Sequence, residues 1–284
     1  MAVMRTIVQI KETLEARGLT PKRALGQNFL IDQNLIRKLI DSAGPADGRL
    51  AFEVGPGAGA LTEPLLDAGW RVVASELDDG LCDWITDEFA GLIESGDLKL
   101  VRGDCLQSKR EIAPMALAAL GEGEFTHIAN LPYSIATPLI LTLLVEHPRC
   151  KSLHVTIQRE VADRLAAAPG SKTYGEISVI TQALAQVKLI AKVPPSCFWP
   201  QPKVESAMIS ITRLDEPLTD NPSDLVEFTH RVFARRRKQL GSILKDAVSA
   251  GLVWPEGIEP TDRPERLSPE MMIGLWEAVQ VVEG

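Results

Sequence analysis

The segment Asn130-Leu131-Pro132-Tyr133 combines a side-chain amide, a backbone carbonyl and an aromatic ring in four consecutive residues. The exocyclic amine of a base such as adenine is a poor nucleophile because its lone pair is delocalised into the ring. The Asn130 side-chain oxygen and the Leu131 carbonyl could accept its two N–H bonds, and Pro132 would hold that carbonyl in one direction. With both N–H groups bound, the nitrogen would become pyramidal, and its lone pair would be free to attack the carbon of a methyl donor. These residues therefore predict catalysis by positioning and electrostatics, without a covalent intermediate.

Two aromatic residues could hold the base. Tyr133 supplies a stacking face for an extracted base, and Phe198, in a proline-rich loop, is expected to cover the other face. The alternative for residues 130–133 is a buried strand-to-helix turn with a packed aromatic ring. A glycine-rich motif upstream favours the chemical interpretation.

That motif, EVGPGAGALT in residues 53–62, follows an apolar run, and its Gly55 and Gly57 would let a ligand approach the backbone. Glu76 stands 17 residues after Gly59, at the end of the next apolar run, where a carboxylate can reach a ribose diol. Asp104 follows the third apolar run and could accept from an adenine amino group. Together they predict a pocket of nucleoside size for a cofactor.

Two alternatives remain open for this pocket. The glycines and a downstream acid also fit a nicotinamide dehydrogenase, although Thr62 occupies the position of the third, helix-packing glycine. No residue set for the acid–base work of hydride transfer accompanies them. Glu76 and Asp104 could also be ordinary solvated acids at strand ends or helix caps.

Short apolar runs alternate with amphipathic stretches, which predicts a Rossmann-like α/β fold with a parallel sheet and helices on both faces. Helices are expected after Asp32 and Ser134 as N-caps, with Pro138 in the first turn of the second, and a last helix from Ser268-Pro269. A short N-terminal helix should end near Gly18. The predicted strands are 49–54, 71–76, 98–102, 126–130, 152–158, 186–193 and 206–214.

The composition becomes polar and turn-forming in residues 215–222, and only helical periodicity follows. We therefore expect a cofactor-binding domain in residues 1–216 and a small all-helical domain in residues 217–284.

The formal net charge of −8 alone argues against a nucleic-acid partner, but the charge is unevenly distributed. Acids dominate residues 41–97, whereas Arg235, Arg236, Arg237 and Lys238 lie within a basic segment, residues 231–245. We expect that segment to be a helix that contacts a phosphate backbone. A solvated basic face is the alternative.

The four cysteines show no paired spacing, so neither a metal site nor a disulfide framework is predicted. We expect reduced thiols in the cytoplasm. Charges interrupt the apolar residues of the N-terminus, which excludes a signal peptide or membrane span there.

From residue 21 to residue 267 the chain resembles the small-subunit ribosomal RNA adenine N6-dimethyltransferases of the KsgA type. The resemblance is carried in order by LGQNFL (residues 25–30), the glycine motif, Glu76, Asp104 and NLPY (residues 130–133). Later matching blocks are SKTYG (171–175), PPSCF (194–198), PKVES (202–206) and FARRRK (233–238).

This resemblance implies a class I methyltransferase fold and S-adenosylmethionine as cofactor. It implies a substrate of two adjacent adenines in the 3′-terminal hairpin loop of 16S rRNA, methylated within the 30S particle or a late assembly intermediate. Lys203 and the Arg235–Lys238 cations would contact RNA, and we expect a monomer. The implied cofactor contacts are Asn28, Leu30, Gly55, Glu76, Asp104 and Asn130.

Two positions depart from the family pattern, and both affect only the expected substrate contacts. Ser134 stands where the family often has Asn, and Gly241 follows the basic segment where an Asn is expected. Three alternatives stay open: a large-subunit rRNA methyltransferase of the macrolide-resistance type, a mitochondrial transcription-factor relative, and a non-catalytic assembly factor.

Overall fold

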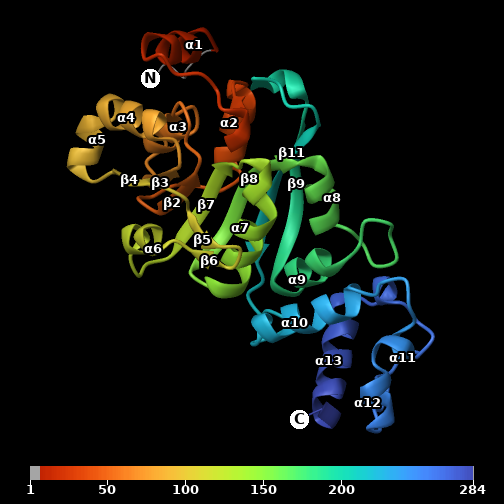
Figure 1. Cartoon of the computed structure of the whole chain (residues 1–284). Helices are drawn as coiled ribbons and strands as arrows, with labels where there is room; N and C mark the ends of the chain where they lie inside the picture. The colour runs from red at the N-terminus through yellow and green to blue at the C-terminus, as the bar shows by residue number, and fades with distance from the viewer. Residues whose placement is uncertain (1–6, 284) are drawn as a thin grey trace. The chain divides into compact units, whose positions relative to one another are not determined.

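A seven-stranded sheet in the order β4-β3-β2-β7-β8-β11-β9 forms the centre of the computed structural model, which describes residues 7–283 (Figure 1). β2 pairs in parallel with β3 and β7, β3 with β4, and β7 with β8, whereas β11 runs antiparallel to β8. The strands are β2 (Leu50–Val54), β3 (Arg71–Glu76), β4 (Leu98–Arg102), β7 (Phe125–Asn130), β8 (Cys150–Gln158), β9 (Ala185–Val193) and β11 (Ser206–Arg213). All seven predicted strands are thereby confirmed.

The strand order reverses at β2. The chain proceeds from β2 to β3 and β4 on one side, and then returns to place β7 on the other side. The carboxyl ends of parallel strands meet at the same edge, and a reversal of strand order opens a crevice there. The ends of β2, β3 and β7 therefore bring the glycine motif, Glu76 and Asn130 together.

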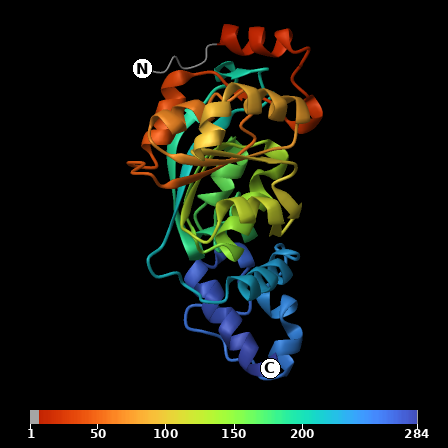
Figure 2. The same cartoon turned by 90° about the vertical axis from the view of Figure 1, so that its left-hand side faces the viewer.

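Helices cover both faces of the sheet, as predicted. Ala51 and Val72 share a core cluster with residues of α2 (Gln33–Asp41), α3 (Thr62–Asp67) and α4 (Asp79–Glu88). Phe52 points to the opposite face, because successive strand side chains alternate, and packs there against the rings of Phe125 and His127. Figure 2 shows α4 (orange) and α6 (Pro114–Leu120, yellow-green) on opposite sides of the strands.

The N-terminal helix α1 (Ile7–Ala16) ends before Gly18, as expected, and Gly18 has the positive φ of 65° that favours glycine. Ile10 and Leu14 pack with Leu81 of α4 and with Phe29. The chain then passes through a short turn, η1 (Arg23–Leu25), to the two-residue strand β1 (Phe29–Leu30). Residues 7–30, called the N-terminal segment, are thus held against the side of the sheet that α4 covers.

Four short strands were not predicted. β1 pairs antiparallel with β10 (Phe198–Trp199), in the proline-rich loop after η2 (Pro195–Cys197), and β5 (Leu106–Ser108) pairs with β6 (Glu111–Ile112). Strands of two or three residues leave no periodic signal in the sequence. The β1–β10 pair fixes Phe198 beside the N-terminal segment.

The chain divides into two compact units. The first contains the residues up to Leu143, His147–Ala162 and Lys188–Thr212; the second contains Leu144–Glu146, Asp163–Val187 and the chain from Arg213 onward. The second unit therefore includes α9 (Glu176–Leu184), which packs with α10 (Pro222–Phe233) and α13 (Pro269–Glu283). The domain boundary at residues 216/217 stays a prediction.

No strand follows residue 217 within the described chain, which agrees with the helical periodicity there. Ser268 precedes α13, and its hydroxyl accepts from the Met271 amide at 3.3 Å, as its predicted capping role requires. The remaining helices are α5 (Ala90–Ser95), α7 (Tyr133–Glu146), α8 (Arg159–Leu165), α11 (Leu240–Ile243), α12 (Lys245–Ser249) and η3 (Pro264–Arg266).

The helix starts were predicted with mixed success. Asp32 caps α2, because its carboxylate accepts from the amides of Asn34 and Leu35 at 3.0 Å. Ser134 as an N-cap was wrong: α7 begins at Tyr133, directly after Pro132, so Pro138 lies inside the helix rather than in its first turn. Pro132, with ψ of 130°, is extended and itself ends the strand-to-helix turn.

The predicted helix over residues 231–245 was also wrong. α10 ends at Phe233, and the amides of Arg235, Arg236 and Lys238 bond to carbonyls three residues earlier, which is the pattern of turns. A continuous helix would place like charges one turn apart, which is unfavourable. The cations instead follow the carboxyl end of α10, where the helix dipole favours positive charge.

Among residues 7–283, none of the helices is both long and apolar enough to cross a membrane. All four cysteines lie within the described chain, and none of them is bonded to another cysteine.

A buried hydrogen bond from Tyr174 connects two distant segments of the second unit. Its side chain is fully buried, and its hydroxyl donates to the Leu267 carbonyl at 2.8 Å. Tyr174→Phe would leave that carbonyl without its donor, so we expect urea denaturation to show a loss of about 1–3 kcal/mol in the free energy of unfolding. An unchanged free energy would contradict a structural role for this bond.

Candidate active site

A cavity of about 260 Å³ opens at the carboxyl edge of the sheet, where the strand order reverses. All its lining residues belong to the first unit. Among them are all five predicted catalytic residues (Asn130, Leu131, Pro132, Tyr133 and Phe198) and, of the predicted cofactor contacts, Asn28, Gly55, Gly57, Glu76 and Asp104. The fold thus brings together sequence motifs that are far apart along the chain.

The side-chain amide of Asn130 is turned in a definite direction. Its Nδ2 donates to the backbone carbonyl of Asn28 at 2.9 Å. An amide that gives its nitrogen to a carbonyl keeps its oxygen on the other side, where it can accept. The Leu131 amide donates to the Thr156 carbonyl at 3.1 Å, and this bond fixes the peptide group between Asn130 and Leu131.

Pro132 lies between two glycines of other segments. A Cβ added to Gly55 would lie 3.4 Å from the Pro132 ring, and one added to Gly26 would lie 3.7 Å from it. Both glycines have positive φ, 71° and 66°, which other residues rarely adopt. The glycine motif and the N-terminal segment therefore both depend on glycine where they approach Pro132.

Tyr133 is anchored by a residue whose role the sequence did not reveal. Its hydroxyl lies 2.7 Å from the Ser206 hydroxyl, and Ser206 is fully buried at the start of β11. Burial raises the pKa of Tyr133, and the bond to Ser206 opposes that shift only in part. The ring is therefore neutral and fixed in place, as a stacking platform requires. Phe198, also buried, lines the same cavity.

Glu76 is a buried carboxylate that accepts three backbone amides. Oε2 accepts from Gly57 at 3.0 Å, and Oε1 accepts from Leu77 at 2.9 Å and from Asp78 at 3.0 Å. Burial raises the pKa of Glu76, whereas the three amides stabilise its charged form. The carboxylate is thereby held rigidly at the cavity wall.

Gly57 must be glycine at this site. Its φ is 58°, and an added Cβ would lie only 2.6 Å from the Phe29 ring. A side chain here would displace either that ring or the amide that Glu76 accepts. Asp104 also lines the cavity; its Oδ1 accepts from the Leu106 amide at 2.9 Å, and its side chain is exposed.

Leu30 does not line the cavity. Its side chain is buried in the core cluster, and its contact with the cofactor stays a prediction. Lys203 is exposed in the loop before β11, three residues from Ser206.

The predicted RNA-contacting cations of the second unit line a hollow of their own, of about 370 Å³, with Ala234 and Ser242. Within residues 7–283 no acid pairs with Arg235, Arg236, Arg237 or Lys238. Arg231, by contrast, forms two bonds to Glu283, at 2.8 and 2.7 Å. The hollow therefore presents uncompensated positive charge, and Arg231 does not add to it.

Residues 18–280 match the family described as ribosomal RNA adenine dimethylase. The chain belongs to this family. It is 39% identical over 282 residues to the ribosomal RNA small subunit methyltransferase A of Phenylobacterium zucineum, covering 97% of this chain and 94% of that protein. It is also 39% identical to the protein of the same name from Rhodospirillum rubrum, covering 95% and 92%. The predicted family is thereby confirmed, with its reaction and its cofactor, S-adenosylmethionine.

Solved structures confirm the predicted fold class. A dimethyladenosine transferase from Plasmodium falciparum aligns with a TM-score of 0.69 at 21% identity, over 87% of this chain and 95% of that one. The 23S rRNA methyltransferase ErmE aligns with a TM-score of 0.64 at 22% identity, over 89% and 100%. At these identities the likeness shows the fold alone.

The cavity fits the cofactor of this family. Gly57 forms a cradle that a Cβ would fill, the buried Glu76 carboxylate suits a ribose diol, and the exposed Asp104 carboxylate can accept an adenine amine. The acids stand at the ends of neighbouring strands, so a nucleoside can lie between them.

Glu53 is a second buried acid next to this site. Its Oε2 accepts from the Thr62 hydroxyl at 2.8 Å, which explains a threonine where dinucleotide sites have glycine. Burial raises its pKa from 4.5 to about 8; the Thr62 bond lowers it, and nearby Glu76 raises it further. Glu53 is therefore largely protonated at neutral pH.

This shift makes a prediction for stability against pH. A carboxyl whose pKa is higher in the folded state contributes stability that is complete below about pH 4.5 and lost as the pH rises through about 8. Glu53→Gln stays neutral, so its free energy of unfolding relative to the parent should rise between pH 5 and pH 8.5, by an amount on the order of 3 kcal/mol. Parallel stability curves for the two proteins would contradict the assignment.

Proposed function

We propose that this enzyme dimethylates the N6 amino groups of two adjacent adenines in the 3′-terminal hairpin loop of 16S rRNA, within the 30S particle or a late assembly intermediate. The observation that carries the proposal is the direction of the Asn130 amide. With Nδ2 bound to the Asn28 carbonyl, Oδ1 can accept from a substrate, and Leu131, whose carbonyl we propose as the second acceptor, lines the same cavity. Two acceptors side by side suit an –NH₂ group.

The reaction follows from these acceptors. S-adenosylmethionine, when bound, supplies a methyl group on a positively charged sulfur. Asn130 and Leu131 accept the two N–H bonds of N6 and stabilise the positive charge that develops on the nitrogen as it attacks. The methyl group would pass to N6, the sulfur would leave as a neutral thioether, and N6 would lose a proton to solvent. Tyr133 and Phe198 hold the base between them.

We assign the cofactor contacts to Asn28, Leu30, Gly55, Gly57, Glu76, Asp104 and Asn130. Glu76 would hold the ribose diol and Asp104 the adenine amine. Asn130 would serve both the cofactor and the target base, since it lies between the N-terminal segment and the strand end.

We assign RNA contacts to the basic hollow, formed by Arg235, Arg236, Arg237 and Lys238, and to Lys203. Guanidinium groups pair well with phosphate oxygens. Since the whole chain is acidic, with a formal net charge of −8, affinity would depend on such local sites and on a preformed ribosomal surface. We propose that the enzyme acts as a monomer in the cytoplasm.

A large-subunit rRNA methyltransferase is the rival function, because ErmE shares the fold. The 39% identity to relatives named for the small subunit favours 16S rRNA, as do the matching blocks at Leu131 and at residues 171–175.

The test is methyl transfer from labelled S-adenosylmethionine to 30S particles that lack this modification, followed by nuclease digestion and identification of the nucleoside. We expect dimethyladenosine at two adjacent positions. Labelling of naked 23S RNA but not of 30S particles would instead support the rival function.

Asn130→Ala tests the chemistry itself. The variant loses one of the two acceptors, so we expect the turnover at saturating cofactor to fall by about a hundredfold or more. Cofactor binding, followed by equilibrium dialysis, should remain measurable as the control. Transfer at the parent rate would show that the lone-pair argument is wrong.

Replacing Arg235, Arg236 and Arg237 together by Ala tests the basic hollow. Affinity for 30S particles should fall, and the slope of log affinity against log salt should become shallower by about 0.7–0.9 for each phosphate that the variant no longer neutralises. Arg231→Ala is the matched control, because Arg231 is already neutralised by Glu283. Equal affinity of the triple variant and the parent at low salt would remove the hollow from the interface.

A further inference from the structure

We propose that Asp78 is a positioning residue for methyl transfer: through Lys22 and Gln27 it fixes the segment Lys22–Asn28, and that segment sets the direction of the Asn130 amide. The proposal deepens the proposed function and rests on it, because Asn130 is the catalytic amide only there. Asp78, Lys22 and Gln27 are called the Asp78 network below.

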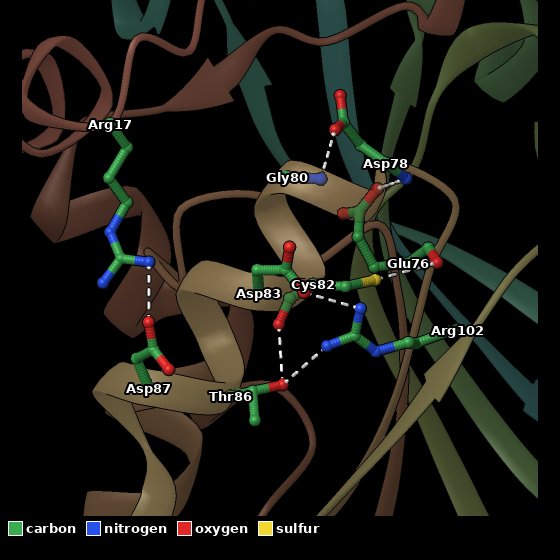
Figure 3. Close-up of polar contacts among 9 residues, drawn as sticks. All are labelled: Arg17, Glu76, Asp78, Gly80, Cys82, Asp83, Thr86, Asp87 and Arg102. Carbon is green, nitrogen blue, oxygen red and sulfur yellow. Dashed lines mark hydrogen bonds and ion pairs between the residues drawn. The ribbon is translucent and has the colours of Figure 1, made fainter.

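Asp78 is an almost fully buried carboxylate, 3% exposed, with partners on both oxygens. Oδ2 lies 2.9 Å from Lys22 Nζ and accepts from Gln27 Nε2 at 3.0 Å. Oδ1 accepts from the Gly80 amide at 3.0 Å and so caps α4, a bond drawn in Figure 3. Burial alone would raise the pKa of Asp78, but the bonds from Lys22, Gln27 and the Gly80 amide, together with the Lys22 charge, outweigh it, and the pKa is lowered.

The N-terminal segment also closes on itself. The Lys22 amide donates to Gln27 Oε1 at 2.7 Å, and the Gly26 amide donates to the Arg23 carbonyl at 3.0 Å. The side-chain amide of Gln27 is therefore held at both its nitrogen and its oxygen. Gln27 cannot rotate without losing one of these bonds.

Two further bonds connect Gln27 to the catalytic amide. Its neighbour Asn28 donates from Nδ2 to the Gly26 carbonyl at 3.0 Å, and the Asn28 carbonyl accepts from Asn130 Nδ2 at 2.9 Å. If the segment moved, Asn130 would lose the acceptor that distinguishes its nitrogen from its oxygen. A flipped amide would present N–H groups to the substrate amine, and two donors cannot pair.

Asp78 is also joined to the cofactor acid. Its backbone amide donates to Glu76 Oε1 at 3.0 Å, and Figure 3 shows the two residues together at the start of α4. One residue thus contacts both the carboxylate assigned to the ribose and the segment that orients Asn130. The geometry links the order of the cofactor site to the order of the catalytic amide.

A second ion pair connects the N-terminal segment with α4 and provides the control. Arg17 Nη1 lies 2.9 Å from Asp87 Oδ2, near the other end of α4, and both side chains are substantially exposed (Figure 3). Neither residue lines the cavity. Loss of the Arg17–Asp87 pair weakens the attachment of the N-terminal segment to α4 but leaves every bond of the Asp78 network in place.

The variants are Gln27→Ala and Lys22→Met, with Lys22→Arg as the conservative replacement and Arg17→Ala as the control. All four keep Asp78 and its cap on α4. The Lys22 side chain is half exposed, so Lys22→Met should fold and keeps the test decisive if Gln27→Ala does not.

The first readout needs no substrate. In ¹⁵N-labelled protein, the side-chain amide resonance of Asn130, assigned by its loss in Asn130→Ala, should shift in Gln27→Ala and Lys22→Met. It should stay in place in Arg17→Ala. An unmoved resonance in both network variants would overturn the proposal, whatever RNA proves to be the substrate.

The second readout is steady-state methyl transfer to undermethylated 30S particles. We expect kcat to fall about tenfold or more in Gln27→Ala and Lys22→Met, with KM for the particles nearly unchanged, because a misplaced catalytic group slows chemistry rather than binding. Lys22→Arg should restore most of the rate. Recovery of full kcat at saturating cofactor would overturn the proposal, since the network would then serve cofactor binding alone. Inactivity of the parent protein would count against the proposed substrate instead, and the resonance would still decide the role of Asp78.

Discussion

A primary amide can accept hydrogen bonds from an amine only through its oxygen, so the methyl transfer that we propose depends on which way the Asn130 side chain is turned. The Asn28 carbonyl sets this orientation, because it accepts a hydrogen bond from Asn130 Nδ2. Most of the site serves that one orientation. Gly26 and Gly55 leave room for Pro132, and the Thr156 carbonyl holds the Leu131 peptide by accepting the Leu131 N–H. Asn130 and Leu131 are thereby held at the end of β7, where both line the cavity.

The sheet makes this arrangement possible by bringing distant segments to one edge. Because the strand order reverses at β2, the glycine motif, Glu76 and the end of β7 meet there. The N-terminal segment then completes the cavity through β1, which pairs with β10 and so places Phe198. Catalysis of this kind needs no acid or base of unusual strength, which agrees with the neutral Tyr133 and with a protonated Glu53 that does not line the cavity.

The sequence predicted those parts of the molecule whose residues form a recognisable pattern along the chain. All seven main strands are apolar runs, and the cavity residues lie in motifs with fixed spacing, so both could be predicted. The bond between Gln27 and Asp78 joins residues 51 apart, and that between Tyr133 and Ser206 joins residues 73 apart, so no periodicity reports them. The predicted start of α7 failed because Pro132 ends the turn before Ser134 is reached. The helix predicted over residues 231–245 failed because a run of adjacent cations forms turns there.

The most direct test of this account is a high-resolution crystal structure of the enzyme with S-adenosylhomocysteine and adenosine bound together. We expect Asn130 Oδ1 and the Leu131 carbonyl oxygen each to lie within hydrogen-bond distance of N6, about 2.7–3.2 Å, while Asn130 Nδ2 remains bonded to the Asn28 carbonyl. A structure in which Nδ2 faces N6, or in which N6 contacts neither oxygen, would contradict it.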